Sequence, residues 1–241
     1  MARRDFRRIA AGAGATSPPK ELDKADPWDS VVLAEADHLR RWTEILASLM
    51  HVADGTAACA DNTVCVDRVQ LDRLFCKFGA SEKYKTAIFF ALAHEFGHLC
   101  QFRCWGVDAA LAMPSIEAEA HADYLAGIWL GLRLTQGHQR LSEDVFDAGI
   151  QLKANTVGYP TPYQRGRLVQ DAMGLAVMLV HIIEPQIPGT ENCHKLEVAL
   201  SDTDVRDLLD TAKSRLEELP KDDSREKLIK RGIFGGPFRR A

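Results

Sequence analysis

The chain has 241 residues, of which 46% are hydrophobic and 27% charged, as in a globular protein that buries a core. Its formal net charge of -4 argues against nucleic acid as the main partner. The sequence holds no run of about 18 apolar residues, so we expect no membrane span.

The N-terminal segment, residues 1–26, predicts a basic arm without stable structure. Its basic part holds four arginines, Arg3, Arg4, Arg7 and Arg8. No apolar segment of a signal peptide follows them, so we expect a cytoplasmic protein with reduced cysteines. Export is the alternative, and Cys59 and Cys65, which flank a predicted turn, could then form a disulfide.

Helical periodicity dominates the next part, and residues 27–219 predict one mainly α-helical domain. The expected helices cover residues 29–50, 67–78, 81–104, 115–134, 142–155, 162–183 and 202–218. Residues 52–62 and 106–114 predict connections, and alternation predicts a strand over 63–67. Residues 220–241 are charged and contain glycine, which predicts a flexible tail.

The helix expected over 81–104 carries the strongest motif, His94-Glu95-Phe96-Gly97-His98. Two histidines four residues apart lie on one helix face, which suits a single zinc ion. Glu95 lies beside them as a candidate general base. Gly97 lowers helix stability by about 1 kcal/mol relative to alanine, which indicates that another helix packs closely there.

A hydrolytic zinc site needs three protein ligands and an open position for water. Glu119, on the next long helix, is the predicted third ligand. Asp123 lies one turn further on and is predicted to accept the free N–H of His94. His121, Glu117 and Asp123 itself are the alternative third ligands.

This ligand set predicts Zn²⁺ as the cofactor, with another divalent ion as the alternative. Two imidazoles and one carboxylate leave zinc positively charged, so a bound water can ionise at a pKa of about 7. Glu95 would take the proton and pass it to the leaving amine of a peptide or protein substrate. The strand around Val64, Cys65 and Val66 predicts a sheet edge beside the metal helix, on which an extended substrate could pair. An ordinary hairpin strand is the alternative.

Two motifs together resemble those of the neutral zinc metallopeptidases of bacteria. That family has His-Glu-x-Gly-His-His-x-Gln followed by Glu-Leu-Gln-Ala-Asp-Cys-x-Ala-Gly-x-Trp. Here the corresponding segments are Ala93-His94-Glu95-Phe96-Gly97-His98 with Gln101, and Glu119-Ala-His-Ala-Asp123-Tyr-Leu-Ala126-Gly127-Ile-Trp129. Residues 59–67 and 78–80 resemble upstream segments of the same family, and the resemblance covers residues 30–180.

The resemblance implies a zincin-like metallopeptidase fold, a glutamate as third ligand and peptidase activity. The chain departs from the family in two places. It lacks the membrane anchor that often follows the basic N-terminus, and Tyr159 stands where the family has a histidine. If that histidine binds the oxyanion, the hydroxyl of Tyr159 is the candidate for this role.

Two other functions remain as alternatives. One is a regulatory metallopeptidase of the antirepressor type, which acts on a single protein partner. The other is a non-catalytic binding module that zinc stabilises and whose arm and tail contact a partner.

Overall fold

The computed structural model describes residues 19–53, 55–76, 82–135, 159–183 and 199–220. Its helices are α2 (Pro27–Thr43), α3 (Arg68–Phe75), α4 (Glu82–Trp105), α5 (Val107–Ala112), α6 (Ser115–Thr135), α8 (Pro162–Ile183) and α9 (Asp202–Glu218). Its strands are β1 (Lys20–Glu21), β2 (Ser48–His51), β3 (Ala57–Ala58) and β4 (Thr63–Val66). The fold is mainly helical with a small mixed sheet, and the helix expected over 142–155 lies outside the described residues.

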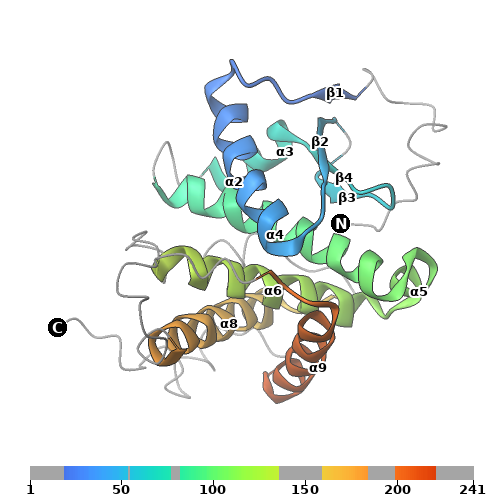
Figure 1. Ribbon diagram of the computed structural model, residues 1–241, viewed down its shortest axis with the longest axis vertical. Coiled ribbons are helices and arrows are strands. Elements are labelled where there is room, and N and C mark those ends of the chain that lie inside the picture. Colours follow the sequence, from blue (N-terminus) through green and yellow to red (C-terminus); the bar gives the residue numbers. More distant parts are fainter. Residues whose placement is uncertain (1–18, 54, 77–81, 136–158, 184–198, 221–241) are drawn as a thin grey trace.

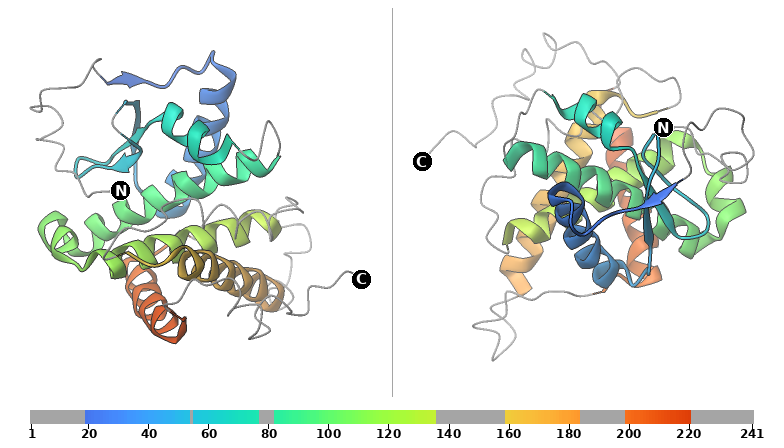
Figure 2. Two further views of the ribbon diagram at one scale, coloured as in Figure 1. Left: turned by 180° about the vertical axis from the view of Figure 1, so that it is seen from behind. Right: turned by 90° about the horizontal axis from the view of Figure 1, so that it is seen from above.

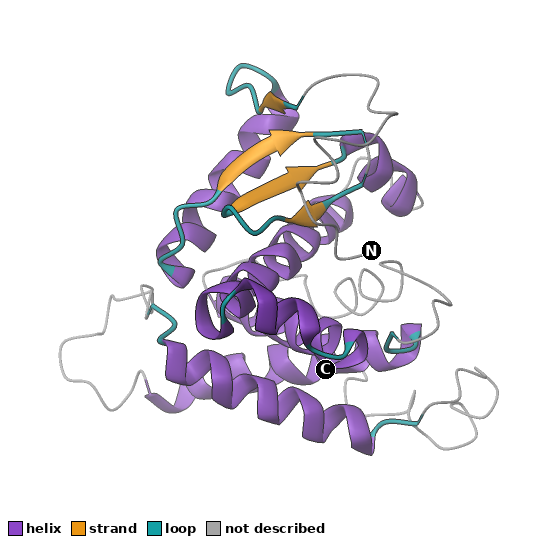
Figure 3. Cartoon of the chain, turned by 90° about the vertical axis from the view of Figure 1, so that its right-hand side faces the viewer, coloured by secondary structure: helices purple, strands orange, loops and turns teal. Residues whose placement is uncertain are grey.

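Helix α4 runs through the middle of the molecule (Figure 1). The sheet and α2 lie on one side of it, and α6, α8 and α9 lie on the other (Figure 3). Helix α6 packs between α4 and α8, so its central residues are buried (Figure 2). The two helices that carry the predicted metal ligands are therefore direct neighbours in the core.

Glycines set how closely these helices approach. A Cβ at Gly97 would lie 2.9 Å from the Cα of Ala122, a distance that real Cβ atoms do not show. A Cβ at Gly127 would lie 2.5 Å from the carbonyl oxygen of Val169 on α8. The close helix approach predicted from Gly97 is therefore confirmed, and it brings α6 against the metal-motif face of α4.

The sheet has the order β1-β2-β4-β3. Strands β2 and β4 are parallel, with Leu49 opposite Val64, and the other two pairs are antiparallel. Strand β4 is therefore central, and all of its residues are buried. Strand β1 lies within the segment for which the sequence predicted an unstructured arm.

Helix α2 is shorter than expected. Asp26 caps its start by accepting the backbone N–H groups of Trp28 and Asp29. The helix stops at Thr43, where Glu44 adopts a left-handed conformation with φ of 54°. The expected helix to residue 50 is wrong after that point, because the apolar residues that follow pair with β4 as strand β2 instead.

Other boundaries differ less. Residues 106–114 were expected to be a connection but contain the short helix α5. Among the described residues, no helix is long and apolar enough to cross a membrane. Cys59 and Cys65 are free buried thiols whose sulfur atoms lie 3.3 Å apart, so the turn between them does bring them into contact.

Candidate metal centre

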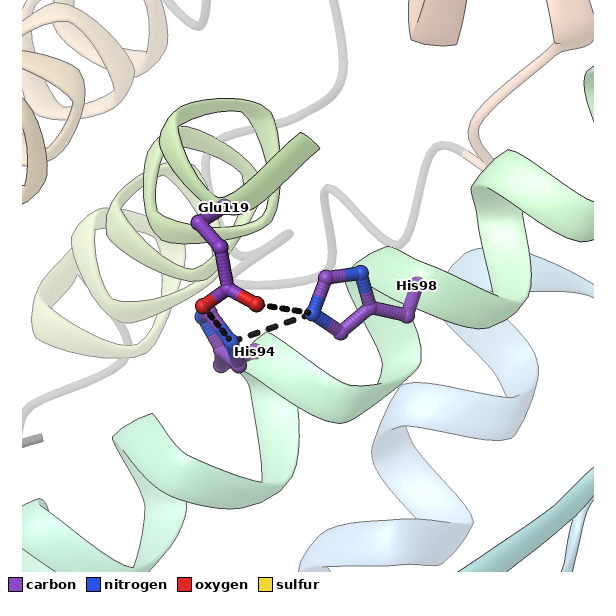
Figure 4. Close-up of side chains that lie close together, drawn as sticks. All are labelled: His94, His98 and Glu119. Atoms are coloured by element: carbon purple, nitrogen blue, oxygen red, sulfur yellow. Dashed lines mark hydrogen bonds and ion pairs between the residues drawn. The ribbon is translucent and has the colours of Figure 1, made fainter. Parts of the chain in front are cut away.

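The three predicted ligands meet between α4 and α6. His94 and His98 point from α4 toward Glu119 on α6 (Figure 4). The two Nε2 atoms are 3.2 Å apart. Glu119 places Oε2 3.4 Å from Nε2 of His94 and Oε1 3.7 Å from Nε2 of His98. One turn of α4 and one residue of α6 thus bring three metal-binding atoms together in a buried position.

These distances fit a tetrahedral metal ion. Zinc binds nitrogen and carboxylate oxygen at about 2.0–2.2 Å, so two ligands of a tetrahedral site lie about 3.3–3.6 Å apart. The two Nε2 atoms, 3.2 Å apart, and the pair formed by Nε2 of His94 and Oε2 of Glu119, 3.4 Å apart, fall on or within about 0.1 Å of that range. The other carboxylate oxygen, Oε1, lies 3.7 Å from Nε2 of His98. Two imidazole nitrogens and a carboxylate within 4.8 Å of one another therefore fit a zinc ion by donor type and closeness, and such an ion would keep a fourth position for water.

His94 is held by an ionic chain. Its Nδ1–H donates to Oδ1 of Asp123 at 2.9 Å, as the sequence predicted for a metal-bound imidazole. Arg165, on α8, donates from Nε to Oδ2 of Asp123 at 2.7 Å and from Nη2 to Oδ1 at 2.6 Å. No sequence pattern assigned a role to Arg165. Its contact with Asp123 was missed because α8 lies some forty residues further along the chain.

His98 is held by a neutral chain. Val205 can only accept through its carbonyl oxygen, so the His121 Nε2 atom, 3.0 Å away, carries the hydrogen. The Nδ1 atom of His121 then accepts from Nε2 of Gln101 at 3.2 Å. Gln101 also donates to the carbonyl oxygen of Ala118 at 2.7 Å, so its Oε1 faces His98. His98 Nδ1–H donates to that oxygen at 3.0 Å, which leaves its Nε2 lone pair directed at the metal position.

The alternative third ligands lie elsewhere. His121 uses both ring nitrogens in the chain behind His98, and burial lowers its pKa to about 3, which keeps it neutral. Glu117 forms an ion pair with Lys213 on α9 at 2.6 Å. Asp123 is engaged by His94 and Arg165. Glu119 therefore stands alone among the four candidates in facing both histidines.

Without a metal, the pKa values of the two histidines are shifted in opposite directions. Burial lowers the pKa of His94, but hydrogen bonds to Asp123 and Glu119 outweigh it and raise that pKa to about 10. Burial and the charge of His94 lower the pKa of His98. Burial also opposes ionisation of Glu119, but its contacts with His94 outweigh this and lower its pKa to about 2. In the metal-free protein, His94 is therefore the positively charged imidazolium, and it lies next to the Glu119 carboxylate.

The formal charges of this buried cluster favour a divalent cation. Glu95, Glu119 and Asp123 bring three carboxylates into the core, all less than a tenth exposed. Arg165 brings one guanidinium beside them. With neutral histidines, two negative charges remain, and buried charges are stable only when they are paired. A doubly charged metal ion would balance them.

Glu95 lies on the sheet side of the metal group. Its side chain is buried, and its Oε2 accepts the backbone N–H of Ala58 at 2.8 Å. Strand β3, which contains Ala58, is thus the strand next to the metal helix and lies at the edge of the sheet.

The prediction that the strand around Val64, Cys65 and Val66 offers a free edge is wrong. Strand β4 pairs with β2 on one side and with β3 on the other. The alanine-rich segment before β4 was interpreted as loop, because two-residue strands have no periodicity that a sequence pattern can show. The edge beside the metal group belongs to β3.

Tyr159 is partly buried in the turn just before α8, the helix that carries Arg165. Its proposed contact with an oxyanion stays a prediction. Comparison of the chain with models of known protein families, with curated proteins and with solved structures finds no significant match. The resemblance to the neutral zinc metallopeptidases therefore rests on the motifs alone.

Proposed function

We propose that the protein is a zinc-dependent peptidase with a zincin-like fold, related to the neutral zinc metallopeptidases of bacteria. The observation that carries the proposal is the position of the three ligand atoms of His94, His98 and Glu119. Two imidazole nitrogens and a carboxylate oxygen, buried within 4.8 Å of one another, are the donor set of a catalytic zinc site. Glu95 follows His94 on the same helix, which is where a His-Glu-x-x-His motif carries its general base.

The residues have distinct roles in the proposed reaction. A bound zinc ion would polarise the scissile carbonyl and acidify a water molecule. Glu95 would take a proton from the attacking water as the water oxygen bonds to the scissile carbonyl carbon, and would give that proton to the amine as the C–N bond breaks. Asp123 and Gln101 hold the two ligand histidines in the tautomers that leave Nε2 free.

The substrate is proposed to be an extended peptide segment that pairs with β3. This strand is at the edge of the sheet, and Ala58 within it contacts Glu95 directly. A peptide added to an exposed edge gains main-chain hydrogen bonds without a sequence requirement. Binding there would place one peptide bond next to the general base.

Metal analysis and a single substitution test the proposal. The purified protein should bind near-stoichiometric Zn²⁺ and cleave peptides from an unbiased library, and a chelator should stop cleavage reversibly. Glu95→Gln should keep the metal and lower kcat by at least about 100-fold, because general base catalysis contributes that much or more. Glu117→Gln is the matched control, since Glu117 pairs with Lys213 outside the metal group.

Two outcomes would contradict the peptidase assignment. A wild-type protein that binds no divalent metal would exclude the site itself. A protein that binds zinc but cleaves neither library peptides nor any protein presented to it would instead fit the zinc-stabilised binding module. Unchanged activity in Glu95→Gln would exclude Glu95 as the base.

A further inference from the structure

Arg165 is one of the largest fully buried side chains in the described part of the protein, with 1% of its surface exposed. It enters from α8 and reaches two carboxylates of α6. Two hydrogen bonds of 2.7 and 2.6 Å join it to both oxygens of Asp123. Its Nη2 atom also lies 3.7 Å from Oε2 of Glu119. One guanidinium thus contacts the third metal ligand and the residue that holds His94.

The two carboxylates would not stay in place without a cation. Glu119 and Asp123 are four residues apart, so they project from the same face of α6 and repel each other. Both are buried, where ionised carboxylates are unstable unless they are paired. Arg165 offsets this repulsion before any metal arrives. Its planar fork also fixes the plane of the Asp123 carboxylate, which a point charge cannot do.

The geometry points to Arg165 as a positioning residue that pre-organises the metal site. Through Asp123 it directs the Nδ1–H of His94, so that the Nε2 atom faces the metal position. Through Glu119 it holds the third ligand carboxylate toward both histidines. This inference rests on the proposed metal site and deepens it, since it assigns a function to α8, which supplies no ligand.

The two roles that Arg165 could have, orienting the carboxylates or only carrying a charge, predict opposite changes in metal affinity when it is removed. If Arg165 acted only as a charge, removing it would relieve its repulsion of the incoming cation and tighten metal binding. If it positions the carboxylates, removing it must weaken metal binding. Loss of a group that hydrogen-bonds to a metal ligand and orients it typically weakens metal affinity by about 10–100-fold. The direction of the change therefore separates the two roles.

The experiment measures metal affinity and stability together. Full-length protein is stripped with a chelator and titrated with Co²⁺ and Zn²⁺, and unfolding by urea is followed without metal. We expect Arg165→Met to weaken Co²⁺ and Zn²⁺ binding by about 10–100-fold. Arg165→Lys keeps the charge but not the two-pronged contact, so it should recover much of the stability and little of the affinity. It also keeps the test informative if Arg165→Met fails to fold.

Arg133→Met is the matched control. Arg133 lies further along α6, and its Nη2 atom pairs with Oε2 of buried Glu35 at 3.2 Å, away from the metal group. Its loss should destabilise the protein and leave metal affinity within about twofold, because distant sites do not couple. A merely structural Arg165 would behave in the same way.

The outcomes separate this inference from the function on which it rests. A wild-type protein that binds neither Co²⁺ nor Zn²⁺ would overturn the metal site itself. Wild-type binding with equal or tighter binding in Arg165→Met would overturn the positioning role alone. Wild-type affinity in Arg165→Lys would show that the charge suffices, which also overturns it. Weaker binding in both Arg165 variants, with the Arg133 variant unchanged, supports it.

Discussion

His94 and His98 lie one turn apart on the same face of α4, yet the protein supports them by different chemistry. Behind His94 stands a buried ion pair, Asp123 with Arg165, contributed by two other helices. Behind His98 stands a neutral chain that begins with Gln101 on α4 itself. The same residue type in the same motif therefore depends on charges in one case and on amide and imidazole hydrogen bonds in the other.

The difference shows how a buried site can favour a cation without placing more negative charge in the core than the cation would neutralise. The ionic chain provides negative charge that would attract a metal ion, and Arg165 limits that charge to what a divalent ion would balance. The neutral chain sets a tautomer and adds no further charge. If both histidines were backed by carboxylates, the metal-free core would hold one more unpaired charge, which is costly.

The largest effect should come from breaking the ionic chain. Asp123→Asn keeps the size of the side chain but leaves the Arg165 guanidinium buried without its main ionic partner. Removing one member of a buried pair costs about 3–5 kcal/mol. Urea unfolding in the presence of a chelator should show a loss of that size in the free energy of unfolding. A loss below 1 kcal/mol, which is what surface pairs typically give, would show that the ion pair is not buried in solution.

Breaking the neutral chain should cost less. Gln101→Met preserves volume but removes the acceptor of His98 and the donor of His121. Buried groups left without a hydrogen bond cost about 1–3 kcal/mol. The same unfolding measurement should therefore place Gln101→Met between the wild type and Asp123→Asn. If Gln101→Met destabilises the protein more than Asp123→Asn does, the ionic chain is not the stronger of the two supports.

The sharpest contrast between the two histidines is expected from pH in the metal-free protein. The pKa of His94 is raised from its ordinary value of 6.5 to about 10, so its protonated form is stabilised by folding. That stabilisation is complete below pH 6.5 and is lost as pH rises toward 10. The pKa of His98 is lowered, so its contribution is present above pH 6.5 and is lost as pH falls below that value.

Variants of each histidine read out this contrast. The difference in unfolding free energy between the wild type and His94→Asn should shrink as pH rises from 6.5 to 10. The corresponding difference for His98→Asn should shrink only as the pH is lowered below 6.5. If this difference in unfolding free energy depends on pH in the same way for both variants, the groups that hold His94 and His98 do not differ electrostatically.

Much of the site could be predicted because its parts lie close together in the sequence. Spacing of four residues puts His94 and His98 on one face of a helix wherever that helix packs. The two-residue offset between Glu119 and His121 sends them to different faces of α6, and the structure places them so. Gly97 predicted the close approach of a second helix, because a Cβ at this position would meet Ala122.

The sequence by itself determined which side chains share a helix face, since helical periodicity depends only on local spacing. It therefore predicted most of the helices, the candidate ligands and the partner of His94. Only the tertiary structure decided that α2 ends at Thr43, that β3 rather than β4 is the edge beside Glu95, and that Arg165 supports Asp123. These features depend on contacts between segments that meet only when the whole core packs, and no local pattern specifies such contacts.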